Sequence, residues 1–224
     1  LGEKVMELQG IIFQQIIFFA TVLLIGFAVS RGKLITSECV DQLQKFMIKV
    51  TLPFLILTSV ANGGTREELF EVWPFVFVMF FMFGLTIVIG FVTGKIMGLK
   101  QTELASHACS TSFVNSALVG FPIITAVFPE RSGLYIAAYL IVETIMTWTA
   151  GVAILSSAKG KAQINFKKMI TPSTVALGIG LLMIFLGIRP TGTAWEAVTG
   201  VGNVQKYIGL LYIGADIGRR GVKK

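Results

Sequence analysis

Stretches without charged side chains, each about long enough to cross a bilayer as a helix, recur along this 224-residue chain. Five of them occupy residues 8–30, 50–65, 72–94, 104–129 and 169–188, and the second extends backwards as a helix to about Asp41. Two further stretches contain charge: residues 134–156 include Glu143, and residues 197–218 include Lys206 and Asp216. A helix needs about 20 residues to span the hydrocarbon core. The sequence therefore predicts an all-α polytopic membrane protein with seven spanning helices.

Composition excludes several other classes of protein. Hydrophobic residues make up 54% and charged residues 14%, which is too apolar for a soluble globule. The net charge of +7 is scattered between the apolar stretches, whereas a nucleic-acid binder gathers basic residues on one face. Cys39 and Cys109 lie far apart, and His107 is the only histidine, so the spacing supports neither a metal site nor a disulfide framework. We expect a lipid bilayer as partner, and no nucleic acid, metal or cofactor.

The basic residues between the spans predict which side of the membrane they face. Twelve follow spans one, three, five and seven, and four (Lys4, Arg66, Arg131 and Arg189) lie at the opposite side. Lys and Arg concentrate in cytoplasmic loops. We therefore expect a multi-pass protein of the inner cell membrane, with the N-terminus outside and the loop between helices five and six in the cytoplasm.

Two short sequence similarities at one spacing predict an internal repeat. Residues 25–27 (Ile-Gly-Phe) resemble residues 186–188 (Leu-Gly-Ile), and residues 44–46 (Gln-Lys-Phe) resemble residues 205–207 (Gln-Lys-Tyr), both at an offset of 161. One repeat then holds five spans, and an odd number of spans inverts the second copy, as in many secondary transporters. The alternative is a chance match between short apolar words.

This repeat divides the chain into two parts. Residues 1–160 hold the first five helices, and residues 161–224 hold the first two helices of the inverted copy. A complete second copy would end near residue 320, so we expect about three further helices in the whole protein.

Span four carries the most polar intramembrane segment and a proline. Thr111 and Asn115 are four residues apart, and Ser112, Ser116 and Gly120 follow one another at intervals of four, so these residues share one helix face. Pro122 lacks a backbone donor. We expect the helix to break between Asn115 and Pro122, near mid-membrane, where freed amides can hold an anion. Thr111, Ser112, Asn115, Gly120 and Pro122 are the candidate substrate-binding residues; the alternative is an ordinary proline kink.

Two other spans contain candidate functional or distorted positions. Glu143 lies at the middle of span five, one helical turn before Thr147, and a carboxylate at that depth must be paired, hydrated or protonated. Both are candidates for ion coupling, although Glu143 could equally serve as a hydrogen-bonding partner of another helix. Thr51 and Pro53 predict a distortion in span two. Lys206 and Asp216 could pair inside span seven, but the spacing assigns them no role.

Residues 115–122 (Asn-Ser-Ala-Leu-Val-Gly-Phe-Pro) resemble the Asn-x-x-x-x-Gly-x-Pro crossover signature of the auxin efflux carrier family, the prokaryotic relatives of plant auxin transporters. Residues 31–34 (Arg-Gly-Lys-Leu) and 50–53 (Val-Thr-Leu-Pro) resemble the first two helices of that family. The resemblance implies ten helices in two inverted five-helix repeats, a fold shared with bile-acid sodium symporters. Helices one, two, six and seven would form a scaffold that can dimerise, and helices three to five would belong to a transport domain with a broken crossover helix.

The function implied by this resemblance is secondary transport of small organic anions, such as carboxylates or auxin-like compounds, by an elevator-type motion coupled to H⁺ or Na⁺. No enzyme motif is present in the sequence. A sodium-coupled symporter of the bile-acid type is the first alternative. A membrane sensor that binds a ligand without transporting it is the second.

Overall fold

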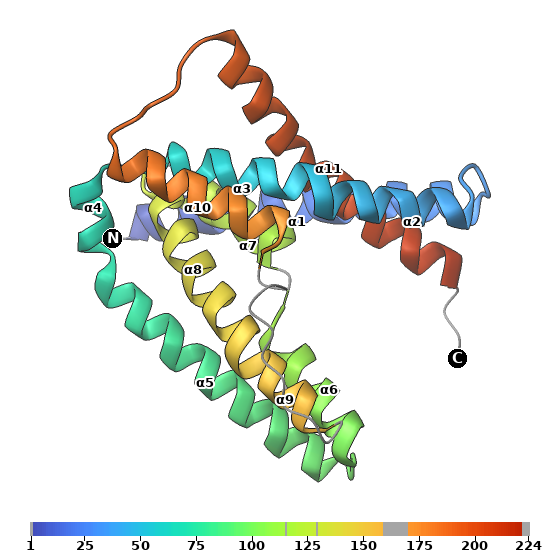
Figure 1. The fold of residues 1–224 in the computed structure, drawn as a ribbon. Coiled ribbons are helices and arrows are strands. Elements are labelled where there is room, and N and C mark those ends of the chain that lie inside the picture. Colours follow the sequence, from blue (N-terminus) through green and yellow to red (C-terminus); the bar gives the residue numbers. More distant parts are fainter. Residues whose placement is uncertain (1, 115, 129, 159–169, 221–224) are drawn as a thin grey trace.

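The computed structural model describes residues 2–114, 116–128, 130–158 and 170–220, and every regular element in these ranges is helical (Figure 1). The elements are α1 (Gly2–Arg31), α2 (Ser37–Phe46), the π-helical turn η1 (Met47–Thr51), α3 (Leu52–Ala61), α4 (Arg66–Glu71), α5 (Trp73–Ile96), α6 (Gln101–Ser112), α7 (Ser116–Val127), α8 (Ser132–Met146), the π-helical turn η2 (Thr147–Gly151), α9 (Val152–Ser157), α10 (Pro172–Phe185) and α11 (Thr193–Arg220). The prediction of an all-helical chain is confirmed.

Four helices are long and apolar enough to cross a membrane: Gln9–Arg31, Ser37–Ala61, Trp73–Ile96 and Ser132–Ser156. The second and fourth are continuous rods, in which a π-helical turn joins two α-helices. α10 is a shorter apolar helix. The predicted span at 197–218 lies within α11, a helix that is long but not apolar enough to be among the four.

The helices form two groups (Figure 1). In the first group, α1 packs along α11, α10 packs along α3, and α3 also contacts α11. In the second group, α5 packs against α6 and α8, and α6 contacts α9. α7 contacts α1 and α11 on one side and α8 on the other, and α8 also contacts α3 and α10, so both α7 and α8 join the two groups.

Glycines allow α1 and α11 to approach at backbone contact. A Cβ atom at Gly218 would lie 2.8 Å from the carbonyl oxygen of Phe27, and one at Gly214 would collide with the backbone of Leu23. On the other helix, a Cβ atom at Gly26 would collide with the backbone of Leu211. Small residues at helix interfaces are the usual means of close packing in membranes. The sequence order of these contacts shows that the two helices run parallel.

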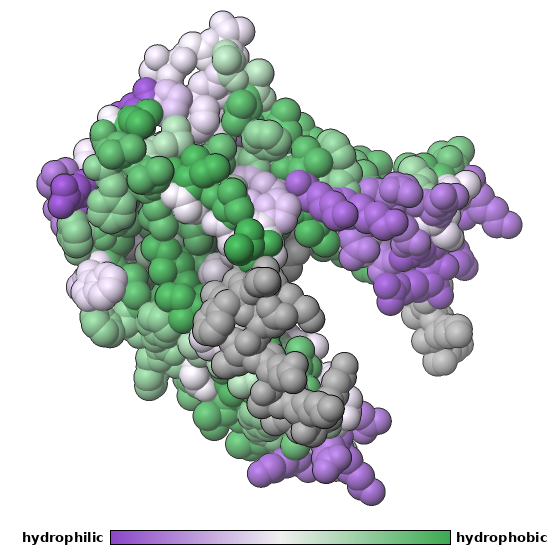
Figure 2. All heavy atoms as spheres, viewed as in Figure 1, coloured by the Kyte–Doolittle hydropathy of each residue, from purple (hydrophilic) through white to green (hydrophobic). Residues whose placement is uncertain are grey.

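The outward faces of α1 and α5 are apolar, as lipid contact requires. Phe13 is 64% exposed, Phe81 is 69% exposed and Ile96 is 80% exposed. Figure 2 shows such apolar surface over much of the visible face, with hydrophilic residues gathered at the α2 and α11 end and at the end of the second helix group. This distribution fits a protein whose helices cross a bilayer and whose loops reach its surfaces.

A capped turn sets where α4 starts. Thr65 Oγ1 accepts a hydrogen bond from the Glu68 amide, and Glu68 Oε2 accepts one from the Thr65 amide at 2.8 Å. The bond from the Thr65 amide lowers the pKa of Glu68 below its ordinary value, since it favours the charged carboxylate. The reciprocal pair therefore caps the N-terminus of α4.

Candidate functional site beside a broken helix

The fourth span is interrupted, but not where the sequence predicts. α6 ends at Ser112, Phe113 has a non-helical backbone (φ −104°, ψ 70°), and α7 begins at Ser116. The expected break between Asn115 and Pro122 is therefore wrong in position, because Gly120 and Pro122 lie inside α7. Asn115 itself lies outside the described residues. A proline removes one hydrogen bond of a helix, which α7 tolerates at this position.

Hydroxyl groups weaken the last turn of α6. Thr111 Oγ1 donates to the carbonyl of His107 at 2.9 Å, and Ser112 Oγ donates to that of Ala108 at 2.8 Å. Such bonds back to the preceding turn compete with the helical amides and bend helices. They favour the end of α6 several residues before Pro122 but do not cause it alone, since the same kind of bond at Thr21 lies within the continuous helix α1.

The aromatic ring of Phe113 anchors the interruption. It stacks on Phe83 of α5, with ring centroids 5.8 Å apart and planes inclined by 28°. A Cβ atom at Gly151 of η2 would lie only 3.1 Å from the same ring, so the glycine makes room for it. The broken backbone is therefore fixed between α5 and η2.

A cavity of about 380 Å³ opens beside this break. It is bounded by the break, by both π-helical turns, by α3 and α8, and by the first turn of α10. Its lining residues are Ile48, Leu52, Ile56, Phe113, Val114, Leu140, Glu143, Thr144, Thr147, Trp148, Ser173, Thr174 and Leu177. The cavity is thus mostly apolar, with one carboxyl group and a few hydroxyls.

The structure brings together only part of the predicted site. Glu143 and Thr147 both line the cavity. Thr111 and Ser112 do not line it, and their hydroxyls are bonded to their own helix. The side chain of Pro122 lies outside the part of the molecule that the structure describes.

Glu143 is the only carboxyl group among the cavity's described lining residues. The hydroxyl of Tyr139, one turn earlier on α8, donates a hydrogen bond to Glu143 Oε1 at 3.2 Å. Leu140 and Leu177 line the same cavity. A carboxyl in such surroundings can exchange a proton or contribute to a cation site, and its charge strongly affects any anion bound nearby.

Both π-helical turns border the cavity, and π turns recur at functional sites. η1 ends at Thr51, directly before Leu52 and Pro53, which is where the sequence predicts a distorted helix. Pro53 cannot donate to the preceding turn, so a wider turn before it is expected. η2 contains no proline, and no residue pattern in span five predicts it.

Sequence reasoning also missed the contribution of α10. Ser173 and Thr174 line the cavity because α10 begins there, with Thr171 as its N-cap and a reciprocal bond between Thr171 and Thr174. The pattern Thr-Pro-x-Thr at residues 171–174 indicates the start of this helix, because proline is frequent in the first turn of a helix.

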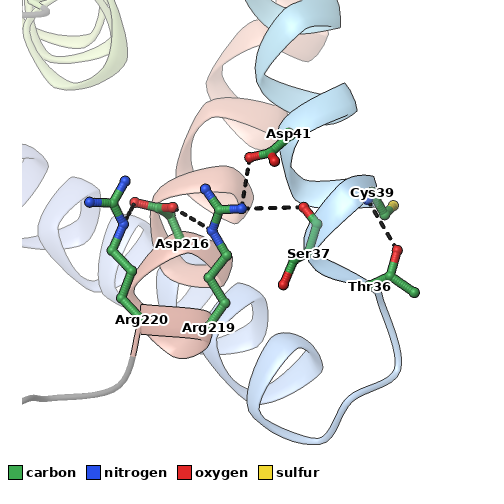
Figure 3. Close-up of polar contacts among 7 residues, drawn as sticks. All are labelled: Thr36, Ser37, Cys39, Asp41, Asp216, Arg219 and Arg220. Atoms are coloured by element: carbon green, nitrogen blue, oxygen red, sulfur yellow. Dashed lines mark hydrogen bonds and ion pairs between the residues drawn. The ribbon is translucent and has the colours of Figure 1, made fainter.

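Asp216 does not pair with Lys206. Its two carboxylate oxygens bind Arg219 at 2.7 Å and Arg220 at 2.8 Å, and Arg219 also binds Asp41 at 2.7 Å and the carbonyl of Ser37 at 3.3 Å (Figure 3). The network ties the end of α11 to the start of α2. The pairing of Lys206 with Asp216, to which the sequence assigned no role, is therefore not formed.

One family comparison bears on the site. The sequence profile of a family described as membrane transport protein matches residues 11–185. This range contains every lining residue of the cavity beside Glu143. No curated protein matches the chain.

Proposed function

We propose that this chain, which belongs to the membrane transport protein family of the auxin efflux carrier type, is a secondary transporter of small organic anions. The observation that carries the proposal is the cavity that joins a broken helix to Glu143. Carboxylates or auxin-like compounds are the proposed substrates. The apolar lining accommodates the body of such a molecule, and the few polar groups orient it.

The anion binds where α7 begins. The first amides of a helix have no partner within that helix and attract negative charge. Val114, two residues before α7, lines the cavity, so these amides start at its edge. In this proposal Asn115 orients the anion, and Gly120 and Pro122 shape α7 behind it. Thr111 and Ser112 act by ending α6.

Glu143 couples the anion to a proton. A carboxylate and a bound anion about 6 Å apart repel by about 3 kcal/mol at an effective dielectric constant near 20. A proton on Glu143 removes this repulsion, which corresponds to about a hundredfold in affinity. Proton and anion then bind cooperatively, as proton-coupled transport requires. Thr147, one turn further along the helix, supplies a hydroxyl beside the carboxyl group.

The arrangement of helices supports an elevator-type motion. α1, α3, α10 and α11 form one packed group, and α5, α6 and α8 form another (Figure 1). An inverted repeat would relate helix one to helix six and helix two to helix seven. The pairing of α1 with α11 and of α10 with α3 has that symmetry and supports the proposed repeat. In this scheme the group formed by α5, α6 and α8 moves with the bound substrate relative to the group formed by α1, α3, α10 and α11.

The test is transport by the purified protein in proteoliposomes with a panel of radiolabelled carboxylates. We expect Glu143→Gln to abolish uptake driven by a pH gradient and to retain exchange of labelled for unlabelled substrate, because its neutral amide cannot release a proton. Glu71→Gln is the control, since Glu71 is exposed and binds Arg131 at 3.6 Å. Proton-driven uptake by Glu143→Gln at the wild-type rate would refute the coupling role. Unchanged flux in both Asn115→Ala and Pro122→Ala would refute the site.

Sodium coupling is the second candidate, favoured by the oxygen groups around Glu143. The hydroxyls of Thr144 and Thr147 line the same cavity as the carboxyl group, and oxygen ligands of this kind suit a hard cation. Uptake that disappears when sodium is replaced by choline, and that does not respond to a pH gradient, would select this alternative.

A further inference from the structure

Lys206 places a positive charge near the middle of α11, the helix that contains the predicted seventh span. It is 13 residues from Thr193 and 14 residues from Arg220, the two ends of α11. At 1.5 Å per residue the nearer end is about 20 Å away, which is too far for a lysine side chain to reach water along the helix. A charged side chain at this depth is costly unless something compensates it.

In the described part of the protein, the Lys206 ammonium group lies over two aromatic rings. Its Nζ atom lies 4.9 Å from the ring centroid of Tyr207 and 5.9 Å from that of Phe18. Among the described residues no carboxylate forms an ion pair with it, and Asp216 is occupied by Arg219 and Arg220. Aromatic faces attract a cation by about 0.5–2 kcal/mol each and do not neutralise it.

Lys206 also lines a cavity of about 220 Å³ between the two helix groups. The other polar lining residues are Gln15, Ser59, Thr125 and Asn203, and the apolar ones are Leu55, Phe121, Ala126 and Ile136. Residues with amide and hydroxyl side chains from α1, α3, α7 and α11 therefore line the same space as Lys206. The chemistry is that of a small site for an anion with an apolar body.

A second cavity, of about 190 Å³, extends this space toward one membrane surface. It shares Ser59, Thr125, Ile136 and Asn203 with the first. Its remaining lining residues are Thr58, Asn62, Glu130, Ser132, Gly133 and Thr199. Asn62 caps the end of α3, Ser132 begins α8 and Thr199 is near the start of α11. The two cavities thus adjoin, and polar residues line them from the ends of these helices to Lys206.

We propose that Lys206 is the counter-charge of a second anion site, which a small carboxylate reaches along this path. The ammonium group supplies the charge, and Asn203, Gln15 and Ser59 supply hydrogen bonds. The two cavities share no lining residue with the cavity beside Glu143, so the site is separate from the one proposed for coupling. By the predicted orientation, the path opens on the outer side.

Cysteine labelling tests the path and the charge without any knowledge of the transported substrate. The background carries Cys39→Ser and Cys109→Ser, and Ser59→Cys introduces a single thiol into the region that both cavities share. Proteoliposomes are treated with a negatively charged sulfonate thiosulfonate reagent and with its positively charged trimethylammonium counterpart. The ratio of the two labelling rates measures the electrostatic potential at the thiol.

We expect both reagents to label the introduced thiol and the anionic reagent to be favoured. Lys206→Gln should lower the anionic-to-cationic ratio by about tenfold, and Lys206→Arg should preserve it. Lys49→Gln is the control, because Lys49 is exposed in η1 and lines neither cavity. A thiol that neither reagent reaches, or a ratio unchanged in Lys206→Gln, would overturn the proposal.

Benzoate serves as the carboxylate probe in the same assay. It should slow labelling of the Ser59→Cys thiol when Lys206 is present and have no effect in Lys206→Gln. Equal protection in both backgrounds, or no protection in either, would overturn the assignment of a carboxylate. Because no step of the assay requires transport or Glu143, its failure is distinct from failure of the proposed function.

Discussion

Thr51 and Gln205 show how a single polar contact can join two parts of the fold. Thr51 is 1% exposed and Gln205 is 0% exposed. The Thr51 hydroxyl lies within hydrogen-bond distance of both the Gln205 side-chain oxygen and the carbonyl of Met47. In the described part of the protein Gln205 Nε2 has no hydrogen-bond partner. The pair therefore fixes η1 against α11 while one donor stays unsatisfied.

We predict that Thr51→Val lowers the free energy of unfolding by about 1–3 kcal/mol, because the whole Gln205 amide is then buried without a partner. The measurement is thermal unfolding of the detergent-purified protein. Gln205→Leu in the same background should restore part of the loss, since it removes the stranded amide. Thr21→Val is the matched control, because the exposed Thr21 hydroxyl binds only the Ile17 carbonyl of its own helix. Equal melting of Thr51→Val and Thr21→Val would contradict the prediction.

Among the helices, the contact of α1 with α11 depends most on glycine. Gly26, Gly214 and Gly218 remove the side chains that would otherwise keep the two backbones apart. Gly200, on the same helix as the last two, faces open space, with nothing within 4 Å of a Cβ atom placed there. One helix thus carries glycines with opposite expected responses to substitution.

We predict that Gly214→Ala destabilises the protein by about 1–3 kcal/mol, because the added methyl group forces α1 and α11 apart. Gly200→Ala should be neutral or stabilise by up to about 1 kcal/mol, since alanine favours a helix where space permits. Thermal unfolding of both variants under one set of conditions makes the comparison. Similar melting temperatures for the two variants would mean that the close approach is not important for stability.

The sequence located most helices correctly, but it placed the interruption between α6 and α7 too far along the chain. Uncharged stretches located α1, α5 and α10, because a span must be apolar over its whole length. The sequence did not predict the break at Phe113. The break depends on the side-chain bonds of Thr111 and Ser112 and on the ring contact with Phe83, a contact that forms only when α5 packs beside it. Pro122 was conspicuous in the sequence and is helical in the structure. The cavity beside Glu143 likewise depends on α10, which is distant in sequence.

At the scale of the whole molecule, the charged ends of the helices define two sides. The Asp41, Asp216 and Arg219 network lies at the end that the basic loops predict to be cytoplasmic, and α4 lies at the other (Figures 1 and 3). Cys39 is exposed and lies at the start of α2, next to that network. Labelling of the native Cys39 thiol can therefore report the orientation of the protein in the membrane.

We predict that a membrane-impermeant maleimide labels Cys39 in inside-out vesicles and not in intact spheroplasts. Cys39→Ser should remove the signal, which separates it from any labelling of the partly buried Cys109. Thr65→Cys in that background, at the opposite end of the α3 rod, should give the reverse result. Labelling of Cys39 from outside would invert the predicted orientation.

The polar character of α11 has a consequence for how the protein is made. α11 carries Glu196, Lys206, Asp216, Arg219 and Arg220, and is not among the helices apolar enough to cross a membrane by composition. Transfer of so polar a segment from the translocon into lipid has an unfavourable free energy. Its partners Thr51, Asn62 and Asp41 belong to helices synthesised earlier. We therefore expect the helices already in the bilayer to assist the insertion of α11, and substitutions in those earlier helices to change its topology.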